Sequence, residues 1–233
     1  MSAEVELRAL VVTQDSGLTA AFMDVSREFG ISAQKSRNNK DGVPEELAIS
    51  KYEALLIDFE TVSQTVPILT TVRQSPANHN AVVFAVVGSP DSRQRARDEG
   101  ATFLLERPLE DEGIRRVLQA AYGLMTSERR RYFRYAVEMA VQIVRDSGEE
   151  VSCRTINISG NGIAISGPVA FQLAEKLQVL LPLQESALPI RATGTVVWDD
   201  KHGKTGLSMQ CINTAMQMKL DSWLDDHFQP SLR

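Results

Sequence analysis

The sequence predicts two domains of different fold class: an N-terminal α/β domain with an open parallel sheet, and a C-terminal antiparallel β-barrel with a closing helix. Its 233 residues suffice for two small domains, since single domains commonly have roughly 100–200 residues. Residues 1–123 carry 13 basic and 18 acidic side chains, which gives −5, whereas residues 124–233 carry 12 of each and are neutral. The hydrophobic pattern changes at the same place, so we expect the domains at 1–124 and 125–233.

In the first domain, short apolar runs alternate with amphipathic segments. Near-continuous apolar strands that alternate with helices are typical of a parallel sheet covered on both faces. Five strands are expected, at Leu7–Val12, Ile31–Gln34, Tyr52–Phe59, Ala81–Val87 and Thr102–Leu105.

Four helices accompany these strands. Ser16 is the expected cap of the first helix, whose apolar positions Leu18, Phe22 and Val25 share one face before Gly30 ends it. The other helices are expected at Val62–Arg73, Asp91–Glu99 and Leu109–Met125.

In the second domain, apolar residues recur with a period of two, which is typical of strands with one buried face. Turn signals such as Asp146-Ser147-Gly148 separate short strands, and this spacing indicates an antiparallel barrel or sandwich. Trp198 and Trp223 are expected in its core. Strands are expected at 136–143, Val151–Ile156, Gly162–Ile165, Leu177–Leu183, Ile190–Trp198 and Gly206–Met209, with a closing helix at Ala215–Phe228.

Composition argues against several functional classes. Two cysteines, Cys153 and Cys211, are too few for a disulfide framework, and with three scattered histidines they indicate no metal site; we expect inert buried thiols. The sequence holds no nucleophile–base pair, Walker loop or dinucleotide-binding glycine motif, so we expect no enzyme and no cofactor. The net charge of −5 argues against a general nucleic-acid or membrane-surface binder. We see no signal peptide and no apolar run of the roughly 18–20 residues that span a bilayer, so we expect a cytoplasmic protein without membrane insertion.

Two segments of the second domain have the chemistry of a phosphate and guanine site. Arg129, Arg130, Arg131 and Arg134 lie within six residues, and Asn157-Ile158-Ser159-Gly160-Asn161-Gly162 follows later. A planar guanidinium bonds phosphate oxygens or the O6/N7 edge of guanine with two parallel hydrogen bonds, and it stacks on purines. The second segment offers an amide and a hydroxyl, and its last glycine allows close backbone approach or a positive φ. Either segment alone is more often an ordinary solvated surface or turn, but together they favour a nucleotide site.

Together the two segments resemble the PilZ domain, the cyclic di-GMP receptor module, whose signature is R-x-x-x-R followed by [DN]-x-S-x-x-G. Residues 130–134 fit the first part and residues 157–162 fit the second, and the resemblance covers about residues 125–228. It implies a non-catalytic effector in bacterial second-messenger signalling whose ligand is cyclic di-GMP.

The resemblance also implies a role for each motif residue. Arg130 and Arg134 would clamp phosphates and guanine edges, and Arg129 would extend this grip and favour an intercalated ligand dimer. Asn157 and Ser159 would contact the ligand from the barrel, and Gly162 would keep the turn open. The family's mechanism implies that residues 125–134 are a linker that wraps the ligand and changes the domain arrangement or partner docking. Tyr132 and Phe133 either pack this linker or flank the ligand.

The first domain resembles a response-regulator receiver domain. The resemblance rests on strand residues 9–12, on the run 55–58, on residues 98–105 and on Arg107-Pro108-Leu109. Asp58 fits the position of the phosphoacceptor. Where a working receiver has a lysine before the proline, this chain has Arg107.

The acidic pair that holds Mg²⁺ in a receiver is missing. Thr13 and Gln14 stand at those positions, with Asp15 one place late, and Ser89 only approximates the residue that ends strand four. Because Mg²⁺ prefers carboxylate ligands, the resemblance implies a degenerate receiver. We expect a scaffold for a homodimer or for an unknown protein partner, with the helix Leu109–Met125 in the pairing region.

Three alternatives stay open. The chain could be an adaptor gated by phosphorylation of Asp58. It could instead be a nucleic-acid binder that uses the arginine cluster, with an affinity that falls steeply with salt, although the acidic first domain weighs against this. It could also be a PilZ-type protein-interaction module that binds no ligand.

Overall fold

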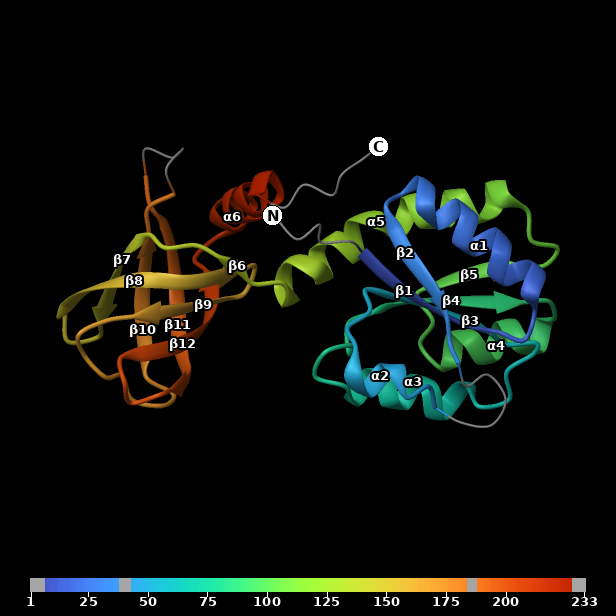
Figure 1. Cartoon of the computed structure of the whole chain (residues 1–233), viewed down its shortest axis with the longest axis horizontal. Coiled ribbons are helices and arrows are strands. Elements are labelled where there is room, and N and C mark those ends of the chain that lie inside the picture. Colours follow the sequence, from blue (N-terminus) through green and yellow to red (C-terminus); the bar gives the residue numbers. More distant parts are fainter. Residues whose placement is uncertain (1–6, 38–42, 184–187, 228–233) are drawn as a thin grey trace. The chain divides into compact units, whose positions relative to one another are not determined.

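The computed structural model describes residues 7–37, 43–183 and 188–227 (Figure 1). The chain forms two compact units, which divide between Arg129 and Arg130. Each unit has buried clusters of its own.

The N-terminal unit is built on a parallel sheet of five strands in the order β2-β1-β3-β4-β5 (Figure 1). The middle strands, β3 and β4, are buried at every position, because Leu, Ile, Val, Ala and Phe dominate them and helices cover both faces. The predicted α/β fold class is therefore confirmed. The strands are β1 (Leu7–Val12), β2 (Ile31–Lys35), β3 (Ala54–Asp58), β4 (Val82–Val87) and β5 (Phe103–Glu106).

Two hydrophobic clusters lie on opposite faces of this sheet. One joins α1 and α5 to the sheet through residues such as Phe22, Phe84 and Leu118. The other joins α2, α3 and α4 to the sheet through residues such as Leu47 and Ile68. The short helix α2 was not expected from the sequence. The helices are α1 (Ser16–Glu28), α2 (Glu46–Ile49), α3 (Thr65–Gln74), α4 (Pro90–Asp98) and α5 (Asp111–Tyr132).

The helix predicted to end at Met125 continues to Tyr132, so the first part of the expected linker is helical. Glutamate and arginine are good helix formers, and two ion pairs with buried carboxylates hold this part of the helix. Lys51 Nζ lies 2.6 Å from Glu128 Oε1, and Arg129 Nη1 lies 3.3 Å from Glu53 Oε1. These contacts join residues far apart in sequence, so local patterns could not reveal them.

The C-terminal unit is an antiparallel barrel, which decides between the two architectures left open by the sequence. Six strands follow in the order β8-β7-β10-β11-β12-β9, and β9 pairs back with β8. The strand expected at 136–143 is interrupted, so that β6 and β7 pair with different parts of β8. The elements are β6 (Tyr135–Ala136), β7 (Ala140–Arg145), β8 (Glu150–Ser159), β9 (Gly162–Ser166), β10 (Lys176–Leu181), β11 (Ile190–Asp199), β12 (Lys204–Cys211) and α6 (Thr214–His227).

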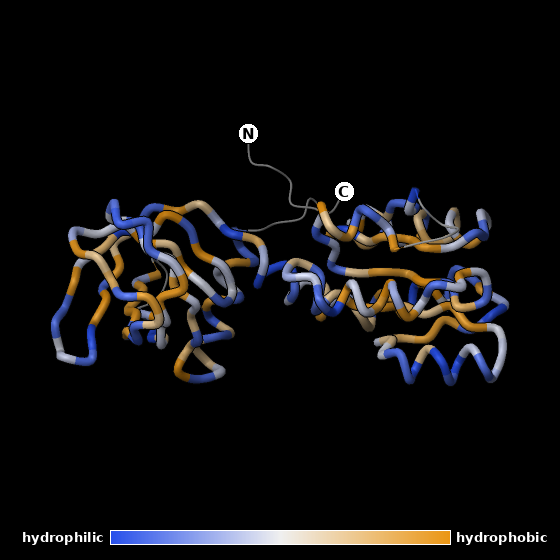
Figure 2. Tube along the Cα trace, turned by 90° about the horizontal axis from the view of Figure 1, so that it is seen from below, coloured by the Kyte–Doolittle hydropathy of each residue, from blue (hydrophilic) through white to orange (hydrophobic). Residues whose placement is uncertain are grey.

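The barrel core comes from alternate residues of its strands, and Figure 2 shows apolar and polar stretches following one another along them. Helix α6 adds Leu220, Trp223 and Leu224 to this core. Burial raises the pKa of the thiols of Cys153 and Cys211, of which the first is buried and the second half-buried. The predicted end of the closing helix, Phe228, lies outside the described residues.

Trp198 is not a core residue, so that prediction was wrong. Its side chain is 42% exposed and lies across Gly206 of the neighbouring strand β12. The pairing of β11 with β12 shifts between Val196 and Trp198, and this bulge reverses the alternation that would have turned Trp198 inward.

Candidate ligand site

The two predicted ligand motifs meet because β6 pairs with β8. In this antiparallel pair Ala136 lies opposite Asn157. Arg134 directly precedes β6, and its Nη1 donates a hydrogen bond to Asn157 Oδ1 at 3.3 Å. Arg134 is exposed, so a cationic side chain and an amide stand together at the barrel surface.

The turn between β8 and β9 lies against the last turn of α5. The backbone N–H of Gly160 donates to the carbonyl oxygen of Arg130 at 2.8 Å. This bond satisfies a carbonyl in the last turn of the helix, where carbonyl groups lack a partner within the helix. A Cβ atom at Gly160 would lie 3.3 Å from that oxygen. Gly160, which sequence reasoning passed over, therefore lets the second motif approach the first.

Gly162 is needed for close packing. A Cβ atom there would lie 3.0 Å from the carbonyl oxygen of Leu207 on β12 and 3.5 Å from Arg134 Nη2. Its φ is not in the left-handed region. Of the two explanations that the sequence left open, close backbone approach is the one that the structure supports.

Ser159 is buried and its hydroxyl is used within the turn. Its Oγ donates to the carbonyl oxygen of Gly162 at 3.2 Å and lies 3.4 Å from Asn161 Oδ1. In this conformation Ser159 stabilises the turn, so its contact with a ligand stays a prediction.

Arg130 is held by carboxylates of α6. Its Nη1 lies 2.9 and 3.0 Å from the two carboxylate oxygens of Asp225, and its Nε lies 3.9 Å from Asp221 Oδ1. The side chain is only 17% exposed. Gln217 of the same helix donates from Nε2 to the carbonyl oxygen of Gly160 at 3.1 Å. Helix α6 thus contacts both motifs.

Arg129 is directed elsewhere, to the buried carboxylate of Glu53, which also accepts a hydrogen bond from the backbone N–H of Arg8 at 2.8 Å. The structure therefore separates the predicted ligand residues into two groups. Arg129 makes its ion pair within the N-terminal unit, whereas one corner of the barrel unit contains Arg130, Arg134, Asn157, Ser159 and Gly162.

In the N-terminal unit, Asp58 ends β3 with a fully buried side chain. Its Oδ2 accepts hydrogen bonds from the hydroxyl of Thr13 at 2.7 Å and from the hydroxyl of Thr61 at 2.8 Å. Arg107 Nη2 adds a third contact to the same oxygen at 3.0 Å. Three donors therefore meet at one oxygen of the predicted phosphoacceptor.

Arg107 also binds Asp15, from Nη1 to Oδ2 at 3.0 Å, so it bridges two carboxylates. Asp15 caps α1 by accepting from the backbone N–H of Leu18, in place of the predicted cap Ser16. This backbone bond and the bond from Arg107 lower the pKa of Asp15 below the ordinary value of 3.8. Gln14 is exposed, and Ser89 caps helix α4.

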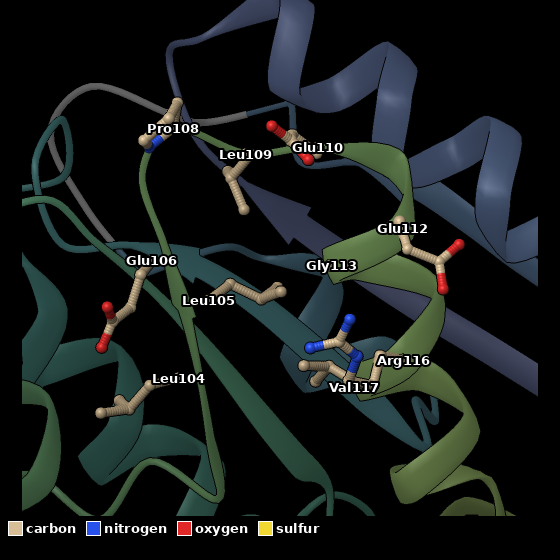
Figure 3. A pocket seen from close by; sticks show the side chains of 10 residues that line it. All are labelled: Leu104, Leu105, Glu106, Pro108, Leu109, Glu110, Glu112, Gly113, Arg116 and Val117. Atoms are coloured by element: carbon tan, nitrogen blue, oxygen red, sulfur yellow. The ribbon is translucent and has the colours of Figure 1, made fainter.

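A cavity of about 320 Å³ opens between β5 and the first turns of α5 (Figure 3). Leu105, Leu109 and Val117 form an apolar floor, and Figure 3 shows Glu106 and Glu112 on opposite sides of it. This cavity lies at the helix that the sequence assigned to partner docking.

Neither a metal centre nor a membrane span is found in the part of the chain that the structure describes. Its histidine, cysteine and carboxylate side chains form no group of three or more that could hold a metal ion. Within the same residues, no helix is long and apolar enough to cross a bilayer.

Comparisons with known proteins gave one family match and several similar solved structures. The PilZ domain matches residues 128–226. The receiver domain of the sensor histidine kinase PA1611 from Pseudomonas aeruginosa is 14% identical, with 51% of this chain and 99% of that chain covered and a TM-score of 0.42. The Bacillus subtilis inhibitor of motility MotI/DgrA is 25% identical, with 45% of this chain and 54% of that chain covered and a TM-score of 0.36. The PilZ domain of CeSA from a cellulose-synthesizing bacterium is 15% identical, with 40% and 98% covered and a TM-score of 0.34. No curated protein matches significantly.

The fold and the motifs define a protein of two modules. The strand order β2-β1-β3-β4-β5 is that of the flavodoxin-like class, to which CheY-type receivers belong. Residues 128–226 are a PilZ domain, and the N-terminal unit has the fold of a response-regulator receiver domain. Both predicted resemblances are thereby confirmed at the level of the fold.

Sequence reasoning missed the residues that hold the motif arginines. Asp225 lies 95 residues from Arg130, and Glu53 lies 76 residues from Arg129. For the pair of Arg130 with Asp225, the sequence offered one indication: the spacing of Asp221 and Asp225 puts two carboxylates on one face of the closing helix. No local signal indicated the second.

Proposed function

We propose that this chain is a non-catalytic cyclic di-GMP effector of bacterial second-messenger signalling. Binding at the arginine motif would change the domain arrangement or the docking of a protein partner. PilZ and receiver-like domains are typically non-catalytic signalling modules, which supports this class of function.

One observation carries the proposal. The pairing of β6 with β8 brings the exposed Arg134 to the amide of Asn157, and the bond from Gly160 to Arg130 joins the second motif to the first. The two sequence motifs therefore adjoin each other at one corner of the barrel, as a shared ligand would require.

The chemistry of this surface suits a guanine dinucleotide with phosphodiester groups. Arg134 can bond a phosphate or the O6/N7 edge of guanine through two nitrogens, and Asn157 adds an amide donor and acceptor. Arg130 supplies a second guanidinium. Ser159 and Gly162 keep the turn in place, with Ser159 reaching the ligand if the turn opens. Arg129 extends the grip only if it leaves Glu53.

The receiver-like unit supports a docking role better than phosphorylation. Thr13 and Gln14 replace the metal-binding acids, and Arg107 already bridges Asp15 and Asp58. These residues do not fit a divalent cation, since a fixed guanidinium provides the positive charge where the ion would bring its own. We therefore propose a degenerate receiver that serves as a scaffold for a protein partner or a second copy of the chain. The cavity beside α5 is its candidate docking surface.

Competition with a fluorescent cyclic di-GMP analogue tests the ligand assignment. Arg134→Ala should weaken binding about 10- to 100-fold, because a two-bond arginine contact is worth about 1–3 kcal/mol. Arg131→Ala is the matched control, since Arg131 is exposed in the same cluster but lies outside the assigned set. If both variants lose the same affinity for cyclic di-GMP, the arginine cluster attracts the ligand only by its overall charge, and the specific role of Arg134 is contradicted. Steeply salt-dependent binding of duplex DNA would favour the nucleic-acid alternative.

A further inference from the structure

We propose that Asp225, with help from Asp221, sets the ligand affinity of this site by occupying Arg130 while the ligand is absent. The inference rests on the proposed function and adds α6 to the ligand site. In this view the carboxylate of Asp225 holds the place that a ligand phosphate takes on Arg130.

The geometry around Arg130 leaves no free two-nitrogen edge. A guanidinium presents two such edges, one formed by Nε and Nη2 and the other by Nη1 and Nη2. Nη1 lies 2.9 Å from Asp225 Oδ1, and Nε lies 3.9 Å from Asp221 Oδ1. The edge that contains Nη1 is therefore occupied by Asp225, whereas Nε in the other edge is buried and has no hydrogen-bond partner among the residues that the structure describes. A phosphate can form a two-bond contact with Arg130 only if the side chains packed around its guanidinium, Asp225 among them, give way.

The negative charge of Asp225 and Asp221 opposes the binding of a ligand phosphate at Arg130. A phosphodiester that approaches Arg130 beside these carboxylates meets like charge, and like charges in one site destabilise each other. Removing the charge of Asp225 should therefore favour the ligand. Arg134, by contrast, has a neutral amide partner and is exposed, so it needs no carboxylate to be displaced before it binds a ligand.

Helix α6 is tied to the site at further points, so its displacement should be measurable. Gln217 Nε2 bonds both the carbonyl oxygen of Gly160 and Asp221 Oδ1. On the same helix the ring of Trp223 packs edge-on against Tyr135, the residue that follows Arg134, with ring centres 5.6 Å apart. The fluorescence of Trp223 should therefore report a displacement of α6 from Tyr135.

Asp225→Asn is the decisive variant, and Asp226→Asn is its matched control. The control makes the same charge change on the same helix, at an exposed neighbour with no ion pair to Arg130. Calorimetric titration with cyclic di-GMP should show binding about three- to tenfold tighter for Asp225→Asn and little changed for Asp226→Asn. Asp221→Asn, whose carboxylate is farther from Arg130, should give a smaller gain. Melting temperatures check that each variant folds.

The outcomes separate this inference from the proposed function. If wild type binds and Asp225→Asn binds equally or more weakly, Asp225 does not compete with the ligand and the inference fails while the function stands. If neither protein binds, both fail. In a Trp198→Phe background, ligand should also change the fluorescence of Trp223. An unchanged signal at saturating ligand would mean that α6 keeps its contact, which contradicts the inference.

Discussion

Single arginines occupy two contrasting environments in this chain, and each environment determines what the side chain can bind. Arg107 and Arg129 face the carboxylates of Asp58 and Glu53, whose side chains are fully buried. Breaking such a pair leaves an uncompensated buried charge, which typically costs about 3–5 kcal/mol. Arg134 is exposed, and its hydrogen bond at 3.3 Å goes to the neutral amide of Asn157. Of these three arginines, Arg134 can bind a ligand without first breaking an ion pair.

Asp58 should resist phosphorylation, because its Oδ2 is occupied by three donors and the side chain is fully buried. We expect no phosphoryl adduct in the intact mass after incubation with acetyl phosphate and Mg²⁺. An adduct on the wild type that is absent from Asp58→Asn would restore the phosphorylation-gated alternative.

Asp15 should make the N-terminal unit sensitive to acid. Its folded pKa lies below 3.8, first because of the Leu18 backbone bond and then because of Arg107. A lowered carboxylate pKa contributes stability above the unfolded value, and this contribution is lost as the pH falls through the folded value. At pH 7, Asp15→Ala should lower the free energy of unfolding by about 1 kcal/mol, and the difference from wild type should shrink toward pH 3.

Urea unfolding at several pH values measures this effect, with Asp15→Asn as the control that keeps a capping side chain. A difference between wild type and Asp15→Ala that stays constant down to pH 3 would contradict the assignment.

At the scale of elements, the hairpin of β8 and β9 positions the second motif, and Gly162 permits its packing against β12. Gly162→Ala should lower the free energy of unfolding by about 1–3 kcal/mol, since the added methyl would lie 3.0 Å from a backbone oxygen. Gly123→Ala, within α5 and with open space around the added atom, should instead stabilise by up to about 1 kcal/mol. Chemical denaturation compares the two, and equal effects would contradict the close-packing argument.

The elements also show what the sequence can and cannot predict. The apolar runs of the first half correctly predict all five parallel strands, and period-two patterning predicts the barrel strands. The extension of α5 to Tyr132 depends on ion pairs to Glu53 and Lys51, and the outward turn of Trp198 depends on a bulge. The motifs could be read because their spacing is local. Their partner Asp225 could not, because it is brought to Arg130 only by the tertiary fold.

At the scale of the whole molecule, the arginine motif spans the division between the two units. Arg129 makes its ion pair within the N-terminal unit, and the next residue, Arg130, makes its ion pairs within the C-terminal unit. A ligand that recruits these arginines would compete with contacts in both units.

Isothermal titration of cyclic di-GMP into the purified full chain tests the central claim most directly. The account predicts saturable binding that is lost in the Arg130→Ala/Arg134→Ala double variant and is not reproduced by GTP, with a stoichiometry that reports a single or an intercalated ligand. Absence of binding heat and of competition at high ligand concentration would contradict it and leave a PilZ-type protein-interaction module.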